Sequence, residues 1–292
     1  MSKKIGVSLT GGGARGGYQI GALKALRDLG ILEKVQCYAG TSIGAANAAV
    51  AASRGVEAAE AVWRNLPEDN IPKKDKVSDT RPRFKINLPD LKEGMYSMDV
   101  FERVMSESID YDAMKTKEVY VTVSRGGQSD QSFLSIFRST YSHYVRRDSQ
   151  VDYMPLHKLS SKMIIQSVVA SCSVPVFFSP VTINDTQFYD GGVFDNVPVT
   201  PLVEAGCDEI IIIYLHRNGK RFTNPSKIFE NVKFHEIKHT GRNLGRVLKF
   251  SKEQTDRLIA LGYEETMHYF ETLQESEPMS VSRSRSNDQS YQ

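Results

Sequence analysis

The sequence predicts an α/β protein in which a mainly parallel central sheet lies between two layers of helices. Ile5–Thr10 alternates apolar and small residues, as expected of a strand, and a glycine loop follows it directly. Tyr18–Leu29 then carries apolar residues at helical spacing up to Gly30. A second apolar strand at Val35–Ala39 leads into an alanine-rich helix at Ile43–Ala52. Strands that alternate with helices in this way pair in parallel and are covered on both faces.

The rest of the chain continues this pattern. Apolar periodicity predicts further helices at Glu57–Asn65, Asp99–Met105, Leu159–Ala170, Pro198–Ala205 and Ser251–Leu273. Apolar and β-branched runs predict strands at Glu118–Ser124, Val181–Ile183, Gln187–Tyr189 and Glu209–Leu215, with Ser132–Phe137 as a hairpin partner of the first. The polar stretch Pro67–Pro89 is typical of a surface excursion or a lid. No linker divides the chain, which predicts a single domain over residues 1–274 and a frayed tail over 275–292.

The composition is that of an ordinary globular protein, with 40% hydrophobic and 25% charged residues. A formal net charge of +2 gives no indication of a nucleic-acid partner. Cys37, Cys172 and Cys207 stand singly, so we expect them to be reduced and mostly buried. The sequence has neither a signal peptide nor an apolar run that spans a bilayer, which predicts a cytoplasmic protein, peripheral at most to a membrane; export without a cleavable signal stays open. Nothing in the sequence indicates an oligomeric state.

The most informative stretch is Gly40-Thr41-Ser42-Ile43-Gly44, which has the form G-x-S-x-G. In a nucleophile elbow, a serine occupies the sharp turn between a strand and a helix, so that its hydroxyl is exposed above the sheet. Here a predicted strand precedes the pattern and a predicted helix follows it. The alternative interpretation of Ser42 is a helix N-cap.

A second glycine cluster, Gly11-Gly12-Gly13-Ala14-Arg15-Gly16, follows the first strand. Consecutive glycines can direct their N–H groups into a concavity, where a helix N-terminus adds positive potential, so the loop is a candidate oxyanion hole. The loop also fits the dinucleotide pattern G-x-G-x-x-G, which requires an acidic residue at the end of the second strand. That strand ends in Ala39-Gly40-Thr41-Ser42, without an acid. A phosphate-binding P-loop is disfavoured because no Gly-Lys-Ser/Thr closes the loop.

The general base is less obvious. Of the six histidines, only His216 follows a predicted strand, so it is the best histidine candidate. Asp190 is better placed, because it ends a short strand and precedes Gly191 and Gly192, which allow a close backbone approach. A carboxylate that touches the serine can take its proton directly, in a two-residue dyad. A hairpin turn is the alternative interpretation of Asp190-Gly191.

In this order, the glycine loop, the Ser42 elbow and Asp190-Gly191-Gly192 resemble the patatin-like phospholipase family. Ala170–Pro180 resembles the family's Ala-Ser-x-Ala-x-Pro-x-x-Phe-x-Pro block, departing at Ser173, where alanine is usual. Asp195-Asn196-Val197-Pro198 resembles its Asn-x-Pro stretch. The resemblance extends over roughly residues 5–215.

The resemblance implies a lipid acyl hydrolase on a three-layer α/β/α sandwich of the patatin-like type. Ser42 would be the nucleophile and Asp190 the base. The oxyanion donors would come from Gly11, Gly12, Gly13, Ala14 and Arg15. Metals and other cofactors are not expected, and the substrate class would be phospholipids or other fatty-acyl esters. The alternative is a catalytically silent lipid-binding or regulatory protein on the same fold.

A basic run late in the chain is a candidate for docking on an anionic membrane surface, or is simply a solvated helix face. Its residues are Lys233, Lys238, Arg242, Arg246, Lys249 and Lys252, with apolar residues between them.

Overall fold

A computed structural model describes residues 3–66, 98–125, 151–174, 178–216, 225–241, 244–247 and 250–276. The sheet formed by these residues has the strand order β5-β6-β3-β2-β1-β7-β8, and β4 pairs with β3. The strands are β1 (Ile5–Leu9), β2 (Val35–Thr41), β3 (Glu118–Arg125), β4 (Val151–Pro155), β5 (Val181–Ile183), β6 (Thr186–Asp190), β7 (Glu209–Ile213) and β8 (Lys233–Ile237). β1, β2, β3, β7 and β8 run parallel to their neighbours in this group, whereas β4, β5 and β6 pair antiparallel.

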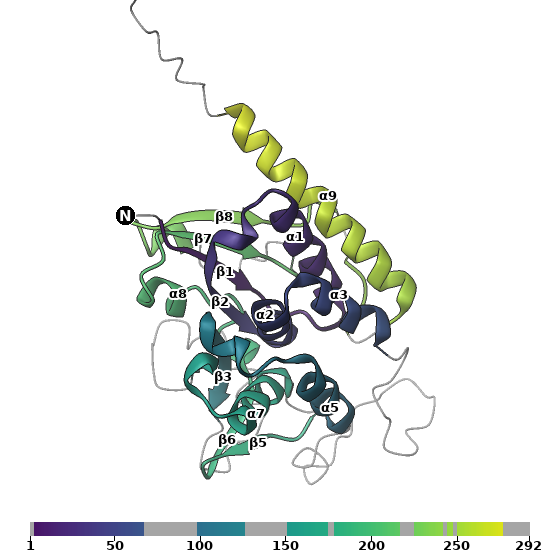
Figure 1. Ribbon diagram of the computed structural model, residues 1–292, viewed down its shortest axis with the longest axis vertical. Helices are drawn as coiled ribbons and strands as arrows, with labels where there is room; N and C mark the ends of the chain where they lie inside the picture. Colours follow the sequence, from purple (N-terminus) through teal and green to yellow (C-terminus); the bar gives the residue numbers. More distant parts are fainter. Residues whose placement is uncertain are drawn as a thin grey trace, which may run out of the picture.

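Helices cover both faces of the sheet (Figure 1). They are α1 (Gly17–Asp28), α2 (Ile43–Arg54), α3 (Val56–Asn65), α5 (Asp99–Ser108), α7 (Ser161–Cys172), α8 (Thr200–Glu204) and α9 (Lys252–Ser276), with a 3₁₀ turn, η1 (Gly13–Gly16), before α1. β7 shows the two faces: Ile210 and Ile212 pack with Leu202 of α8, whereas Ile211 and Ile213 belong to the larger core on the other side. The predicted α/β architecture is therefore confirmed.

A difference in strand length positions the site. The parallel pairing of β2 with β3 ends at Thr41 and Thr122. β3 continues past this point, and its end pairs antiparallel with β6, with Val123 opposite Asp190. Because Val123 also pairs with β4, β4 and β6 occupy opposite edges of β3. β6 therefore pairs with the same edge of β3 as β2 does, starting just beyond the point where β2 ends and the elbow begins.

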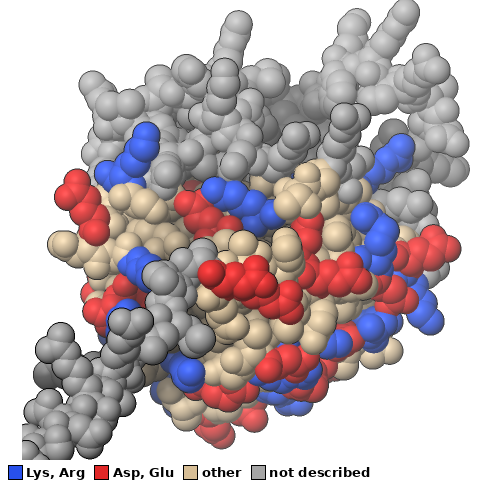
Figure 2. All heavy atoms as spheres, turned by 90° about the horizontal axis from the view of Figure 1, so that it is seen from above, with Lys and Arg blue, Asp and Glu red and all other residues tan. Residues whose placement is uncertain are grey.

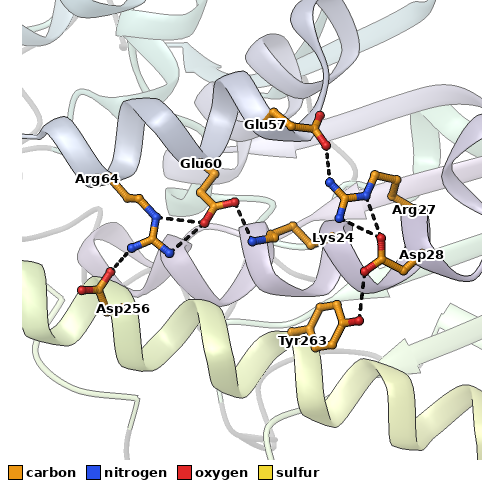
Figure 3. A network of polar contacts seen from close by, with 8 residues as sticks. All are labelled: Lys24, Arg27, Asp28, Glu57, Glu60, Arg64, Asp256 and Tyr263. Carbon is orange, nitrogen blue, oxygen red and sulfur yellow. Dashed lines mark hydrogen bonds and ion pairs between the residues drawn. The ribbon is translucent and has the colours of Figure 1, made fainter.

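The long helix α9 lies against α1, next to α3 (Figure 1). The backbones approach closely at two glycines: a Cβ on Gly21 would overlap the carbonyl of Ile259, and a Cβ on Gly262 would overlap that of Tyr18. Lys24, Arg27, Asp28, Glu57, Glu60, Arg64, Asp256 and Tyr263 form a polar network between the three helices (Figure 3). Most of its ion pairs are open to solvent, although Lys24–Glu60 is more shielded, and each contributes little stability, so close packing is the main constraint.

Several sequence predictions need adjustment. The basic run is not one helix, since Lys233–Ile237 is strand β8 and residues 244–247 have no regular structure. The helix predicted at Pro198–Ala205 is shorter, and β4 was not predicted. Glu275 and Ser276, the first residues of the predicted tail, belong to α9. Pro67–Pro89, Ser132–Phe137 and residues 277–292 lie outside the described residues.

Among the residues that the structure describes, no helix is both long and apolar enough to cross a membrane.

The contact between α1 and α9 can be tested with a Gly21→Ala variant. Its new methyl group meets the backbone of α9, and overpacking of this kind costs about 1–3 kcal/mol of unfolding free energy. Gly17→Ala is the matched control in the same helix, because its nearest neighbour is 3.4 Å away. We expect denaturant unfolding to show a loss of stability for Gly21→Ala and none for Gly17→Ala. Equal stability of the two variants would contradict the packing described here.

Candidate active site

Ser42 occupies a strained turn between β2 and α2. Its backbone angles are φ 55° and ψ −129°, and the side chain is 9% exposed. A Cβ on Gly40 would overlap the carbonyl of Gly44, and a Cβ on Gly44 would overlap that of Leu9. The two outer glycines of the pattern are therefore required by close backbone contact. The strand–turn–helix context of a nucleophile elbow is present, and Ser42 caps α2 without a side-chain cap hydrogen bond.

The structure brings Asp190 to Ser42. Asp190 ends β6, is 5% exposed, and accepts a hydrogen bond from Gly192 N–H at 2.7 Å through Oδ1. Burial raises the pKa of its carboxyl to about 6, although hydrogen bonds from the Ser42 hydroxyl and Gly192 N–H favour the charged form and lower it. The Ser42 hydroxyl thus interacts with a buried carboxylate whose pKa is raised to about 6.

The N–H groups of the glycine loop are not equivalent. Gly11 N–H donates to Asn196 Oδ1 at 3.0 Å, Ala14 N–H donates to Val247 O at 2.6 Å, and Arg15 N–H donates to Gly12 O at 3.3 Å. No acceptor for Gly12 or Gly13 N–H is found within the described ranges. Of the five predicted oxyanion donors, the hydrogen bonding favours Gly12 and Gly13.

Arg15 stabilises the loop through its side chain. Its Nε donates to Gly245 O at 2.9 Å, and Nη1 donates to Leu215 O at 3.5 Å. Burial lowers the pKa of the guanidinium, which nevertheless stays charged at neutral pH. Arg15 therefore connects the glycine loop to later segments of the chain.

Asn196 connects the glycine loop to the turn after Asp190. Besides accepting from Gly11, its Oδ1 would be 3.0 Å from a Cβ on Gly192. Its Nδ2 lies 3.2 Å from Nδ1 of His216. Burial and the charge of Arg15 lower the pKa of His216, which favours the neutral ring. His216, the histidine candidate from the sequence, therefore lies beside Asn196, whereas the Ser42 hydroxyl interacts with Asp190.

Ser171, near the end of α7, is hydrogen-bonded to the backbone of the elbow. Ser42 N–H donates to Ser171 Oγ at 2.9 Å, and Ser171 Oγ donates to the carbonyl of Thr122 at 2.7 Å. The Ser171 side chain is fully buried. Sequence reasoning assigned no role to Ser171 or Asn196, although both fall in the two stretches that accompany the main motifs. The resemblance of those two stretches to the family's motifs was the sequence signal that could have pointed to these residues.

A small apolar cavity begins at Ile43, one residue after Ser42, between α2, α3 and α5. Ile43, Ala46, Val50, Ala59, Trp63 and Phe101 are among its lining residues. Asn47, the polar residue on this wall, is occupied by hydrogen bonds from Trp63 Nε1 and to Gly16 O. The cavity is therefore apolar in character next to Ser42.

Comparison with solved structures finds similar folds at low sequence identity. Human GIVD cytosolic phospholipase A2 matches with a TM-score of 0.51 at 11% identity, covering 93% of this chain and 59% of that chain. VipD from Legionella pneumophila matches with a TM-score of 0.43 at 14% identity, covering 93% and 67%. ExoU in its complex with SpcU, from the type III secretion system of Pseudomonas aeruginosa, matches with a TM-score of 0.42 at 16% identity, covering 92% and 51%. This chain thus spans only about half to two thirds of each of these proteins.

Comparison with curated protein sequences finds no significant match. The family model described as patatin-like phospholipase matches residues 7–203, about two thirds of the sequence. The match includes the glycine loop, the elbow, Asp190 and Asn196. This chain therefore belongs to the patatin-like phospholipase family.

Proposed function

We propose that this protein hydrolyses fatty-acyl esters of phospholipids or related lipids through an acyl-Ser42 intermediate. The observation that carries the proposal is the interaction of the Ser42 hydroxyl, on its strained turn, with the buried carboxyl of Asp190. Family membership supports a lipid ester as the substrate class.

The mechanism follows from the contacts of the two residues. Asp190 takes the hydroxyl proton as Ser42 Oγ attacks the ester carbonyl, and Gly12 and Gly13 N–H receive the developing oxyanion. The tetrahedral intermediate collapses, its C–O bond to the alcohol breaks, and Asp190 returns the proton to the leaving oxygen. Water then attacks the acyl-enzyme with Asp190 again as base, releasing the fatty acid and restoring Ser42.

The apolar cavity supports a substrate with an acyl chain. It measures only about 20 Å³, room for about one water molecule, so a chain can enter only where α3 and α5 move outward. An acyl group on Ser42 would extend along Ile43 into this space. Access from a peripheral membrane surface is part of the proposal, but the face seen in Figure 2 intermixes basic and acidic side chains and favours no broad anionic contact there.

Replacing either dyad residue is the direct test. Ser42→Ala removes the nucleophile and Asp190→Asn removes the base, so we expect each to lower kcat by at least about 10³-fold. The measurement is fatty-acid release from phospholipid vesicles and from a p-nitrophenyl ester, with circular dichroism to verify folding. Wild-type turnover in both variants would show that the dyad assignment is wrong. If wild-type protein binds vesicles without turnover, the silent lipid-binding alternative is favoured.

The raised pKa of Asp190 predicts the pH dependence. The protonated carboxyl cannot accept the serine proton, so kcat/KM should fall about tenfold per pH unit below 6 and be constant above it. Asp195→Asn is the control: Asp195 is also buried with a raised pKa, but it bonds to Tyr153, so the midpoint should not move. A profile without a transition near 6 would contradict the role of Asp190.

The same shift has a consequence for stability. Because folding raises the pKa of Asp190, its favourable contribution to stability is complete below its unfolded value and is lost as pH rises through about 6. Well above that pH, Asp190→Asn should therefore lose activity without a loss of unfolding free energy.

Filling the cavity should change chain-length preference. Ala59→Leu places extra carbon atoms in the cavity, so we expect kcat/KM for p-nitrophenyl palmitate to fall at least about tenfold relative to the butyrate ester. Ala58→Leu makes the same change one residue earlier in α3, at a position that does not line the cavity. An unchanged palmitate-to-butyrate ratio in Ala59→Leu would place the acyl chain elsewhere.

A further inference from the structure

The glycine loop is held by residues late in the chain. Ala14 N–H donates to Val247 O at 2.6 Å, and Arg15 Nε donates to Gly245 O at 2.9 Å. Gln254 Nε2, in the first turn of α9, donates to Ala14 O at 3.3 Å and to Arg246 O at 3.4 Å. These later residues all lie after residue 203, where the family match ends: they are Gly245, Arg246, Val247 and Gln254. Two consecutive residues of the loop are thus fixed from outside the matched region.

The two segments also fit closely together. Gly13 has φ +57°, and a Cβ there would overlap the carbonyl oxygen of Val247. Gly245 has φ +95°, and a Cβ there would overlap Oε1 of Gln254. A glycine in the left-handed region therefore allows the close contact of the loop with Val247, and a second one allows the close contact of Gly245 with Gln254. Such an arrangement leaves the loop little freedom to turn its peptide groups.

The contacts determine which N–H groups remain for the substrate. The bond from Ala14 to Val247 occupies the Ala14 N–H and fixes the peptide group between Gly13 and Ala14. Gly12 and Gly13 N–H are left without an acceptor in the described structure. An oxyanion hole is effective when its donors are held in place before the reaction, because reorientation then costs no energy in the transition state.

We propose that residues 244–247 together with Gln254, here called the C-terminal brace, hold Gly12 and Gly13 N–H in the orientation that receives the oxyanion. Gly245 and Gln254 are then positioning residues: they act on the reaction through the loop and do not touch the substrate. The inference rests on the proposed function, and it adds to the site a part of the chain outside the family match. α9 supplies a rigid base for the brace, because it is packed on α1 at Gly21 and Gly262.

Two variants test the brace without changing the dyad or the glycine loop. Gln254→Glu preserves the size of the side chain but removes the N–H donors and directs a carboxylate toward the carbonyls of Ala14 and Arg246. Gly245→Ala inserts a methyl group against Gln254. The matched control is Glu253→Gln, the reverse change at the exposed neighbouring position of the same helical turn.

Displacing oxyanion donors acts on the transition state more than on substrate binding. We therefore expect kcat for a p-nitrophenyl ester to fall about tenfold to a hundredfold in Gln254→Glu and Gly245→Ala, with KM within about twofold of wild type. Glu253→Gln should retain wild-type values. Thermal unfolding of each protein corrects for any loss of folded enzyme. If Gly245→Ala fails to fold, Gln254→Glu decides. Wild-type kcat in Gln254→Glu, or an equal loss in Glu253→Gln, overturns the proposal.

Hydrogen exchange separates this proposal from the proposed function. If wild-type protein hydrolyses no ester, the proposed function fails, and the brace is judged from the exchange rates of the Gly12 and Gly13 amides alone. Faster exchange of these amides in Gln254→Glu than in Glu253→Gln supports the brace. Equal exchange in the two proteins overturns it.

Discussion

The arrangement of the site depends on the strand pairing at the end of β2. β3 is longer than its parallel neighbour, and β6 pairs with the part of β3 that extends beyond the elbow. Backbone hydrogen bonds, rather than contacts between side chains, therefore place Asp190 beside Ser42. The position of Asp190 relative to Ser42 therefore has little freedom, because a shift of register by one residue would direct Asp190 to the other face of the sheet.

Burial gives this pair its chemical properties. An exposed aspartate is a weak base, but the surroundings of Asp190 raise its pKa to about 6, which in the proposed mechanism reduces the difference from the serine hydroxyl. The strained backbone at Ser42 directs the hydroxyl to Asp190 instead of to the N-terminus of α2, while Ser171 satisfies the Ser42 N–H. The strained conformation of Ser42 is maintained because β2 on one side and α2 on the other hold its backbone in place.

The sequence predicted the parts of the site that depend on local chemistry. The glycines at positions 40 and 44 were recognisable because no other residue fits where two backbones meet, and Asp190 because it ends a strand before two glycines. The sequence predicted no role for Ser171, Asn196 or Gln254, because their side chains bond to backbone groups distant in sequence. A hydroxyl or amide can form such bonds in many places, so its type alone carries no positional signal. The basic run was misinterpreted because charges at irregular spacing do not distinguish a helix from a strand followed by a loop.

The separation in sequence between the glycine loop and its support affects how the protein is made. Arg15 and Gly245 are 230 residues apart, and Ala14 and Gln254 are 240 residues apart. Ser42 and Asp190 are both synthesised once β6 is complete, whereas the support follows only with residues 244–247 and the first turn of α9. Contacts of such long range also form late in folding, because closing the intervening chain costs entropy. A nascent chain would therefore carry Ser42 and Asp190 for some time before the glycine loop gains this support.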